Sequence, residues 1–166
     1  RIPVKPGDFV FVDGGMPHAI GGGCFMVELQ EPSDLMVVAE RLTPSGMRIP
    51  EAKVHGGLGI EKMFEVYDYR NWTYDEICAR YVKFGDASRA LSGSRQILGT
   101  DLTDKFEMWR LAAGGAVALD GAPAVAIVTE GSGAINGRPV RKGDRLVVND
   151  EPAVLCQGDC SVVLCR

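Results

Sequence analysis

Histidine is scarce in this sequence, with two residues among 166, and the five cysteines show no Cys-x-x-Cys spacing. The chain has no His-x-His motif, and one imidazole alone cannot hold a catalytic zinc ion, which needs about three protein ligands. An odd number of cysteines without paired spacing does not indicate a disulfide framework. We therefore expect reduced cysteines, with Cys156, Cys160 and Cys165 packed in an apolar tail.

An excess of basic residues and long apolar runs are also missing. Eighteen Lys and Arg against 22 Asp and Glu give a formal net charge of -4, and the basic residues are scattered. This balance disfavours a nucleic-acid partner. The apolar runs fall far short of the roughly 18 residues that a membrane span needs. We expect a cytoplasmic protein with no nucleic-acid and no membrane partner.

Segments rich in β-branched and aromatic residues dominate both ends of the chain. They are five to eight residues long and are bounded by Gly, Pro, Asn and Asp, which is typical of strands joined by turns. The predicted strands are 8–12, 24–30, 105–111, 124–131, 144–149, 153–157 and 161–166. We therefore predict a mainly β fold, an antiparallel sandwich or barrel.

The middle of the chain has a helical pattern instead. Apolar residues at helical spacing predict a helix over 58–69, and Thr73 with Glu76 forms a capping-box signature before a second helix over 73–82. The predicted buried stripe of that helix consists of Tyr74, Ile77, Cys78 and Tyr81. The following residues, 85–104, are rich in Gly, Ser, Thr and Asp and are predicted to be a connector.

An internal repeat organises the chain. VKPGDFVFVDGGMPHAIGGGCFMVEL, from Val4, matches VRKGDRLVVNDEPAVLCQGDCSVVLC, from Val140, with one residue deleted from the second copy. The shared frame is Val, a basic residue, Gly-Asp, an apolar strand, a turn ending in Pro, and another apolar strand. We infer two copies of one β unit. Strands from about Lys105 precede the second copy. We expect that the first copy either has lost their equivalent or has it in a preceding part of a larger protein.

The two copies differ at a histidine. Aligning Pro17 with Pro152 places His18 opposite Ala153. A lone histidine in a glycine-rich loop is ordinarily a turn residue, whereas the difference between the copies favours a special role for it. The other histidine, His55, is expected to be structural.

The spacing around this histidine is similar to the second signature motif of the cupin superfamily. The matching positions are Gly7, Gly15 and His18, while Asp13 and Gly22 replace the usual proline and asparagine. In cupins this histidine supplies an imidazole to a metal inside a small β-barrel, so the resemblance implies that His18 is a metal ligand.

The cupin resemblance implies a jelly-roll repeat with three parts. Residues 1–54 would form the C-terminal half of a first, metal-type cupin barrel, and residues 55–104 a helical segment and connector. Residues 105–166 would form a complete second barrel without metal.

A narrower resemblance covers essentially the whole chain. PGDFVFVDGGMPHAIGGGCFMVELQEPSD, at 6–34, with LTP at 42–44 and IPE at 49–51, resembles the C-terminal part of type I mannose-6-phosphate isomerases. The later EGSGAINGRPVRKGDRLVV resembles that family's C-terminal domain, where metal ligands are also lacking. The resemblance implies zinc as cofactor and a sugar phosphate as partner. The remaining zinc ligands, a Gln-x-His and a Glu, are expected before Arg1.

Interconversion of mannose 6-phosphate and fructose 6-phosphate moves a proton between C2 and C1 through an enediolate. The reaction needs a base, a cation to stabilise the oxyanion, and a phosphate site. The resemblance implies that Glu28 lies beside the site and that Asp34 does acid-base work. Alternatively, Glu28 is an outward strand residue and Asp34 a turn residue.

The family's catalytic arginine has no direct equivalent. Counting forward from the Ser-Asp pair at 33–34 places it on Val38, and counting back from LTP at 42–44 places it on Ala39. Arg41 is the nearest guanidinium. Arg41 is therefore our third catalytic candidate, although a surface pair with Glu40 is an equal alternative.

Two other functions are compatible with these residues. The chain could be a non-catalytic cupin module that binds a sugar or sugar phosphate, or the second barrel could serve dimerisation. Exposed strand edges would favour self-association. We expect the 166-residue chain alone to be metal-free and inactive.

Overall fold

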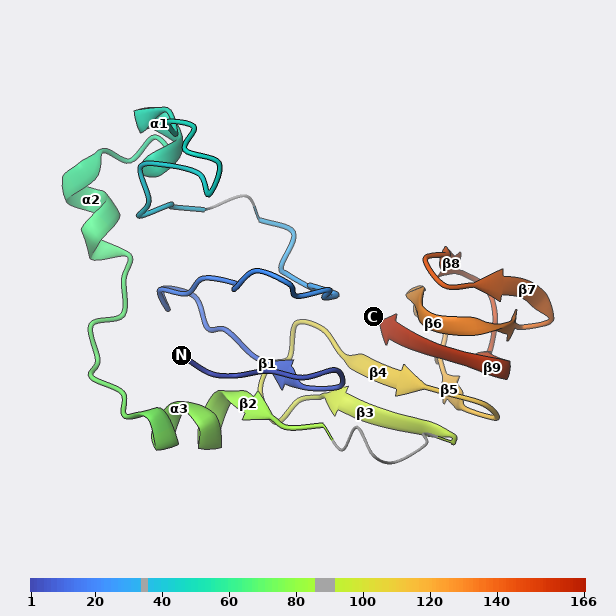
Figure 1. Cartoon of the computed structure of the whole chain (residues 1–166). Coiled ribbons are helices and arrows are strands. Elements are labelled where there is room, and N and C mark those ends of the chain that lie inside the picture. The colour runs from blue at the N-terminus through green and yellow to red at the C-terminus, as the bar shows by residue number, and fades with distance from the viewer. Residues whose placement is uncertain (34–35, 86–91) are drawn as a thin grey trace. The chain divides into compact units, whose positions relative to one another are not determined.

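The computed structural model describes residues 1–33, 36–85 and 92–166 (Figure 1). The helices are α1 (Glu51–Val54), α2 (Ile60–Glu65) and α3 (Tyr74–Tyr81). The strands are β1 (Phe9–Val10), β2 (Val82–Lys83), β3 (Ser94–Leu98), β4 (Met108–Leu111), β5 (Ala116–Ala118), β6 (Ala124–Ile135), β7 (Arg138–Arg141), β8 (Arg145–Val148) and β9 (Ala153–Cys165). The longest helix in these three ranges has eight residues, too few to cross a membrane.

The chain divides into two compact units. The first, here the β unit, comprises Arg1–Phe11 and Cys78–Arg166. The second, here the loop-helix unit, comprises Val12–Ile77 and contains α1 and α2. The candidate residues His18, Glu28 and Arg41 all belong to the loop-helix unit.

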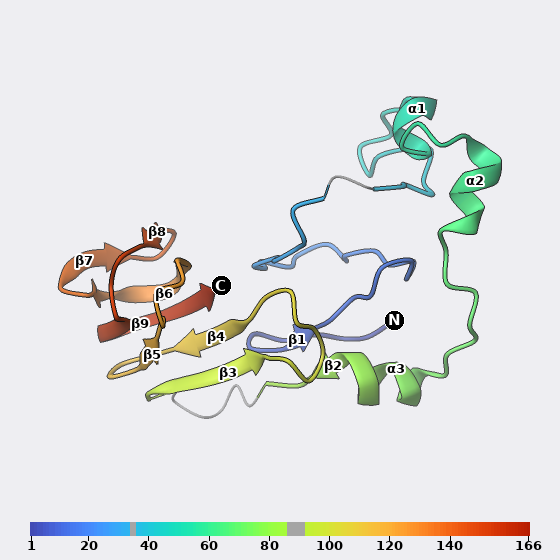
Figure 2. The same ribbon diagram turned by 180° about the vertical axis from the view of Figure 1, so that it is seen from behind.

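An antiparallel sheet forms most of the β unit. Its strand order is β3-β4-β9-β6-β7, with β8 also paired to β6 and β5 to β9. Figures 1 and 2 show β9 between β4 and β6, while β1 and β2 form a separate pair. The mainly β class predicted from the sequence is confirmed, and the antiparallel arrangement is consistent with a jelly roll.

Alternate residues of the two longest strands build the core of the β unit. Successive side chains of a strand point to opposite faces, so every second residue of β6 and β9 can be buried. The members of the core cluster from these two strands are Ala124, Ala126, Val128, Ile135, Val154, Cys156, Cys160, Val162 and Leu164. The other strands and a turn complete the same cluster with Leu111, Val117, Leu119, Val140 and Val148.

The Gly-Asp turn of the repeat has the same structure in both copies. Asp8 Oδ2 accepts the Lys5 N–H at 2.8 Å, and Asp144 Oδ2 accepts the Arg141 N–H at 2.9 Å. The glycine before the aspartate has a φ of 92° in the first copy and 93° in the second, a conformation that favours glycine. The shared Gly-Asp therefore marks one local structure used twice.

The strands that follow this turn differ between the copies. In the second copy they are β8 and β9, and the two predicted strands 153–157 and 161–166 form one continuous strand. In the first copy the predicted strand 8–12 shortens to β1, and the predicted strand 24–30 is absent from the strands the structure assigns. Phe25 there is 73% exposed. Alternating apolar residues form a strand only where a neighbour supplies backbone hydrogen bonds.

Four strands of the described residues lie where none was predicted: β2, β3, β5 and β7. β3 occupies the predicted connector 85–104 and pairs with β4 in the sheet. Its sequence, SRQIL, has two apolar residues and no clear alternation. Pairing with β4, and not its own pattern, decides its conformation.

Both predicted helices are present but shorter. α3 begins with the predicted capping box, because the Thr73 N–H donates to Glu76 Oε2 at 2.8 Å and the Glu76 N–H donates to Thr73 Oγ1 at 3.3 Å. The predicted buried stripe is wrong at Tyr74, which is 51% exposed, and correct at Tyr81, which is 2% exposed.

The C-terminal thiols are buried as predicted. Cys156 Sγ and Cys160 Sγ lie 3.5 Å apart, and Gly133 leaves room for them, because a Cβ there would approach Cys160 Sγ to 2.9 Å. Burial, together with the hydrogen bond to Cys160, raises the pKa of Cys156 from 9.0 to about 12. Burial raises the pKa of Cys165 to about 11.

These thiols make the stability of the β unit depend on pH in alkaline solution. The folded thiols keep protons that the unfolded chain loses above pH 9, so stability is fully present below pH 9 and falls as pH rises toward 11 or 12. Each thiol should contribute a slope of about 1 kcal/mol per pH unit. Urea denaturation between about pH 8.5 and 10.5 measures it. Cys156→Ala should reduce the slope, and Cys24→Ala, at an exposed thiol, should not. Equal slopes in both variants would contradict this assignment.

The repeated turn should contribute measurably to stability. Asp144→Ala removes one hydrogen-bond acceptor and should lower the free energy of unfolding by about 1 kcal/mol. Asp8→Ala should cost more, because Asp8 Oδ1 also accepts the Gly85 N–H at 2.8 Å. Asn at either position keeps an acceptor oxygen and is the matched control. Urea denaturation measures the free energy of unfolding. If it falls as much in the Asn variants as in the Ala variants, the carboxylate charge and not the turn hydrogen bond provides the stability.

Candidate functional site

His18 lies on an exposed loop whose start is fixed by backbone contacts. The Met16 N–H donates to the Asp13 carbonyl at 3.1 Å, and the Asp68 N–H donates to the Gly15 carbonyl at 2.8 Å. A Cβ at Gly15 would approach the Val66 carbonyl oxygen to 2.6 Å, so the chain here needs glycine. The loop is therefore held against the segment that follows α2.

The imidazole of His18 has a defined orientation. Its Nδ1 donates to the Met16 carbonyl oxygen at 3.0 Å, because a carbonyl can only accept. In the neutral ring this leaves the lone pair on Nε2, and the side chain is exposed. Metal-bound histidines commonly donate their second ring nitrogen to a carbonyl in this way. Nε2 is therefore the ring nitrogen of His18 that could ligate a metal.

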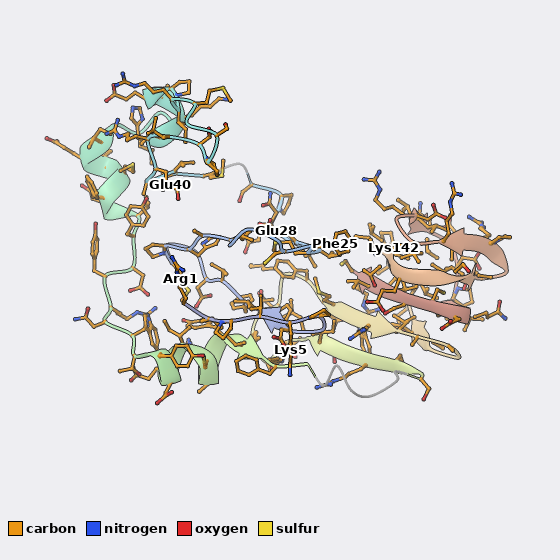
Figure 3. All side chains as sticks on the ribbon, in the orientation of Figure 1. Arg1, Lys5, Phe25, Glu28, Glu40 and Lys142 are labelled. Carbon is orange, nitrogen blue, oxygen red and sulfur yellow. The ribbon has the colours of Figure 1, made fainter. Side chains whose placement is uncertain are left out.

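Glu28 and Arg41 are both exposed and lie on other segments of the loop-helix unit. Figure 3 shows Glu28 on the same extended segment as Phe25. Across the described ranges, no hydrogen bond or ion pair joins Glu28 or Arg41 to His18. The structure does not bring these three candidates into contact.

Arg41 lies at the base of a small turn. Its carbonyl accepts the Ile49 N–H at 2.9 Å, next to the bridge between Leu42 and Arg48. The structure shows no ion pair between Arg41 and Glu40 among the residues it describes. The guanidinium is exposed and available to a ligand.

The other predicted positions give no further site residue. Asp34 lies outside the described residues. Val38, one of the two positions for the family arginine, is half-buried, and its N–H donates to the Val54 carbonyl at 2.8 Å. Ala39, the other position, is exposed.

The described residues do not complete a zinc site. Within 1–33, 36–85 and 92–166, no three or more His, Cys, Asp or Glu side chains come together as a metal site. A catalytic zinc ion takes about three protein ligands and one open position. His18 can provide one of these ligands, so the described part of the chain does not fit zinc by itself.

The second histidine has a structural role. His55 follows α1, and its Nδ1 accepts the N–H groups of Gly57 and Gly59, each at 3.1 Å. The side chain thereby satisfies two backbone donors in the turn between α1 and α2. This agrees with the expectation from the sequence.

The two histidines should therefore carry opposite tautomers when neutral. Nδ1 of His18 donates to a carbonyl and must hold the proton, whereas Nδ1 of His55 accepts two amides and must be unprotonated. Long-range ¹H–¹⁵N NMR of the neutral imidazoles measures this directly. We expect the Nδ1–H form for His18 and the Nε2–H form for His55. The same tautomer for both would show that the His18 ring is not held by Met16.

No family model matches this sequence, and neither does any curated protein. Solved structures do resemble it. A mannose 6-phosphate isomerase from Bacillus subtilis aligns at 14% identity and a TM-score of 0.45, covering 76% of this chain and 37% of that one. The bacterial pirin YhhW from Escherichia coli, in complex with nickel(II), aligns at 24% identity and a TM-score of 0.38, covering 46% of this chain and 39% of that one. A cupin-2 domain containing protein from Shewanella frigidimarina aligns at 12% identity and a TM-score of 0.31, covering 66% of this chain and 92% of that one. This chain spans less than half the length of the isomerase and of the pirin.

Proposed function

We propose that this chain is part of a zinc-dependent mannose-6-phosphate isomerase and that His18 is one of the zinc ligands. The observation that carries the proposal is the Nδ1 hydrogen bond of His18 to the Met16 carbonyl, which directs the lone pair to Nε2. This occurs at the position where the motif resemblance over 6–34 assigns a ligand. In this proposal the enzyme acts in the cytoplasm on a sugar phosphate.

The proposal assigns the other zinc ligands to sequence preceding Arg1. Zinc, when bound, supplies a cation for the oxyanion of the enediolate. Glu28 is assigned a place beside the sugar, and Asp34 is assigned the movement of a proton between C2 and C1. The exposed guanidinium of Arg41 is assigned to the negative charge of the substrate.

One observation favours a second function, a cupin module that binds a sugar phosphate without turnover. The two positions for the family's catalytic arginine hold Val38 and Ala39, and the backbone of Val38 is fixed to Val54. Arg41 would therefore have to replace that arginine from a neighbouring position. Binding of mannose 6-phosphate without conversion to fructose 6-phosphate would identify this second function.

The test compares the two histidines in protein that includes the sequence naturally preceding Arg1. His18→Gln should remove stoichiometric zinc and reduce kcat/KM for mannose 6-phosphate by about 100-fold or more, because one of the protein ligands of the zinc ion is lost. His55→Gln is the matched control and should keep its zinc. Elemental analysis and a coupled isomerase assay measure both. Zinc and activity retained by His18→Gln would refute the proposal.

Arg41 can be tested in the same assay. Arg41→Gln should lower kcat/KM, whereas Arg48→Gln, on the opposite side of the same small turn, should not. The 166-residue chain alone should bind no stoichiometric zinc. Equal losses in the two arginine variants would exclude a specific role for Arg41.

A further inference from the structure

A row of paired residues crosses the large sheet of the β unit and carries arginine at three positions. The register joins, in order, Arg95, Arg110, Val163, Ile127 and Arg145. Directly paired residues of antiparallel strands project from the same face of the sheet. The three arginines therefore share one face, and two of them are direct neighbours.

Among the residues that the structure describes, no carboxylate pairs with either of the neighbouring arginines. Like charges directly opposite each other destabilise a pair of strands. Neither Arg95 nor Arg110 forms an ion pair with a carboxylate in the part of the chain that the structure describes. Glu107, close to Arg110 along the chain, is instead paired with Arg166 at 2.7 Å. Within 1–33, 36–85 and 92–166, the two adjacent positive charges are therefore not compensated by an ion pair.

Arg110 is half-buried and uses little of its hydrogen-bonding capacity. Its Nε donates to the Oγ of Ser161 at 3.3 Å, and Ser161 is only 8% exposed. A guanidinium has five N–H donors, and the described residues supply no acceptor for the two terminal nitrogens. This bond anchors Nε, and the two terminal nitrogens have no hydrogen-bond partner among the described residues.

A glycine leaves space beside those nitrogens. A Cβ on Gly7 would approach Nη1 of Arg110 to 3.0 Å, closer than an ordinary contact. Gly7 also has a φ of 92°, so a larger residue is disfavoured there for two reasons. The backbone of the first Gly-Asp turn therefore lies against the guanidinium without covering it with a side chain.

We propose that Arg95 and Arg110 together bind a phosphate group on this face of the sheet. A guanidinium presents two parallel N–H groups that match the oxygens of a phosphate. Two guanidiniums carry the charge that balances a phosphate monoester, which has about -1.5 to -2 charges at pH 7, whereas a single carboxylate would leave one arginine unmatched. The ligand class is a phosphate ion or a small phosphate ester. The site depends on the β unit alone and not on the proposed isomerase activity.

Arg145 provides a matched control on the same face. It belongs to the same row but lies three strands away from Arg110, at about 14 Å, given roughly 4.8 Å between neighbouring strands. It has the same charge and, like Arg95, is exposed. It is too distant to share a phosphate with Arg110, so its replacement changes net charge without changing the proposed site.

The experiment is a titration of the 166-residue chain with inorganic phosphate at constant ionic strength, followed by ¹H–¹⁵N NMR. We expect saturable shifts in the amides of β3 and β4, with affinity lowered about tenfold or more by Arg95→Gln and by Arg110→Gln. Arg145→Gln should change the affinity less than about twofold. Equal weakening in all three variants, or no saturation in the parent chain, would overturn the proposal.

Arg110→Lys keeps the positive charge and guards against loss of fold. It should retain the spectrum of the parent chain but bind phosphate more weakly, because an ammonium cannot make the paired N–H contact. Unchanged affinity in Arg110→Lys would show that charge alone attracts the ion and would also overturn the proposal. Glucose 6-phosphate as a second titrant separates a site for phosphate esters from a site for the free ion, both of which support the proposal.

Discussion

The pairing of β6 with β9 is the interaction on which the β unit depends. The two strands are matched at ten positions, and each also pairs with strands on its other side. Glycines in both strands lie where the backbone of the partner strand leaves no room for a side chain. A Cβ on Gly131 would collide with the Asp159 carbonyl, and one on Gly133 with the Gln157 carbonyl. Because glycine has no side chain, the two strands can pair closely at these points, and their inner faces can enclose a common core.

The two faces of the sheet differ in polarity, because successive residues of a strand point to opposite faces. The inward row contains Val128, Val162 and Leu111, all fully buried, and the adjacent row contains arginines on the opposite face. A shift of the register by one residue would exchange these faces and bury Arg110 in place of Leu111. Burial of the apolar row thus also determines which positive charges meet on the outside.

How far the sequence predicts this structure depends on the range of each interaction. The capping box of Thr73 and Glu76 and the repeated Gly-Asp turn form within four residues, and both were predictable from the sequence. β3 was not predictable, because its pattern is weak and its conformation comes from β4, which lies further along the chain. The same limit applies to the candidate site. Motif spacing was enough to single out His18. Whether Glu28 or Arg41 approaches it depends on the path of the 9 and 22 intervening residues, respectively, on which the local pattern gives no information.

The two copies of the repeat separate local from non-local causes within one molecule. Their turns agree to within a degree in φ and 0.1 Å in hydrogen-bond length, yet the second copy continues into β9 and the first does not form the equivalent strand. The apolar segments after the two turns are similar, so their own sequences do not explain the difference. The segment in the second copy has β6 and β4 beside it, whereas Phe25 in the first is largely exposed. Strand formation in the second copy therefore depends on its neighbours β4 and β6, whereas the ring orientation of His18 in the first copy is set locally by the Met16 carbonyl.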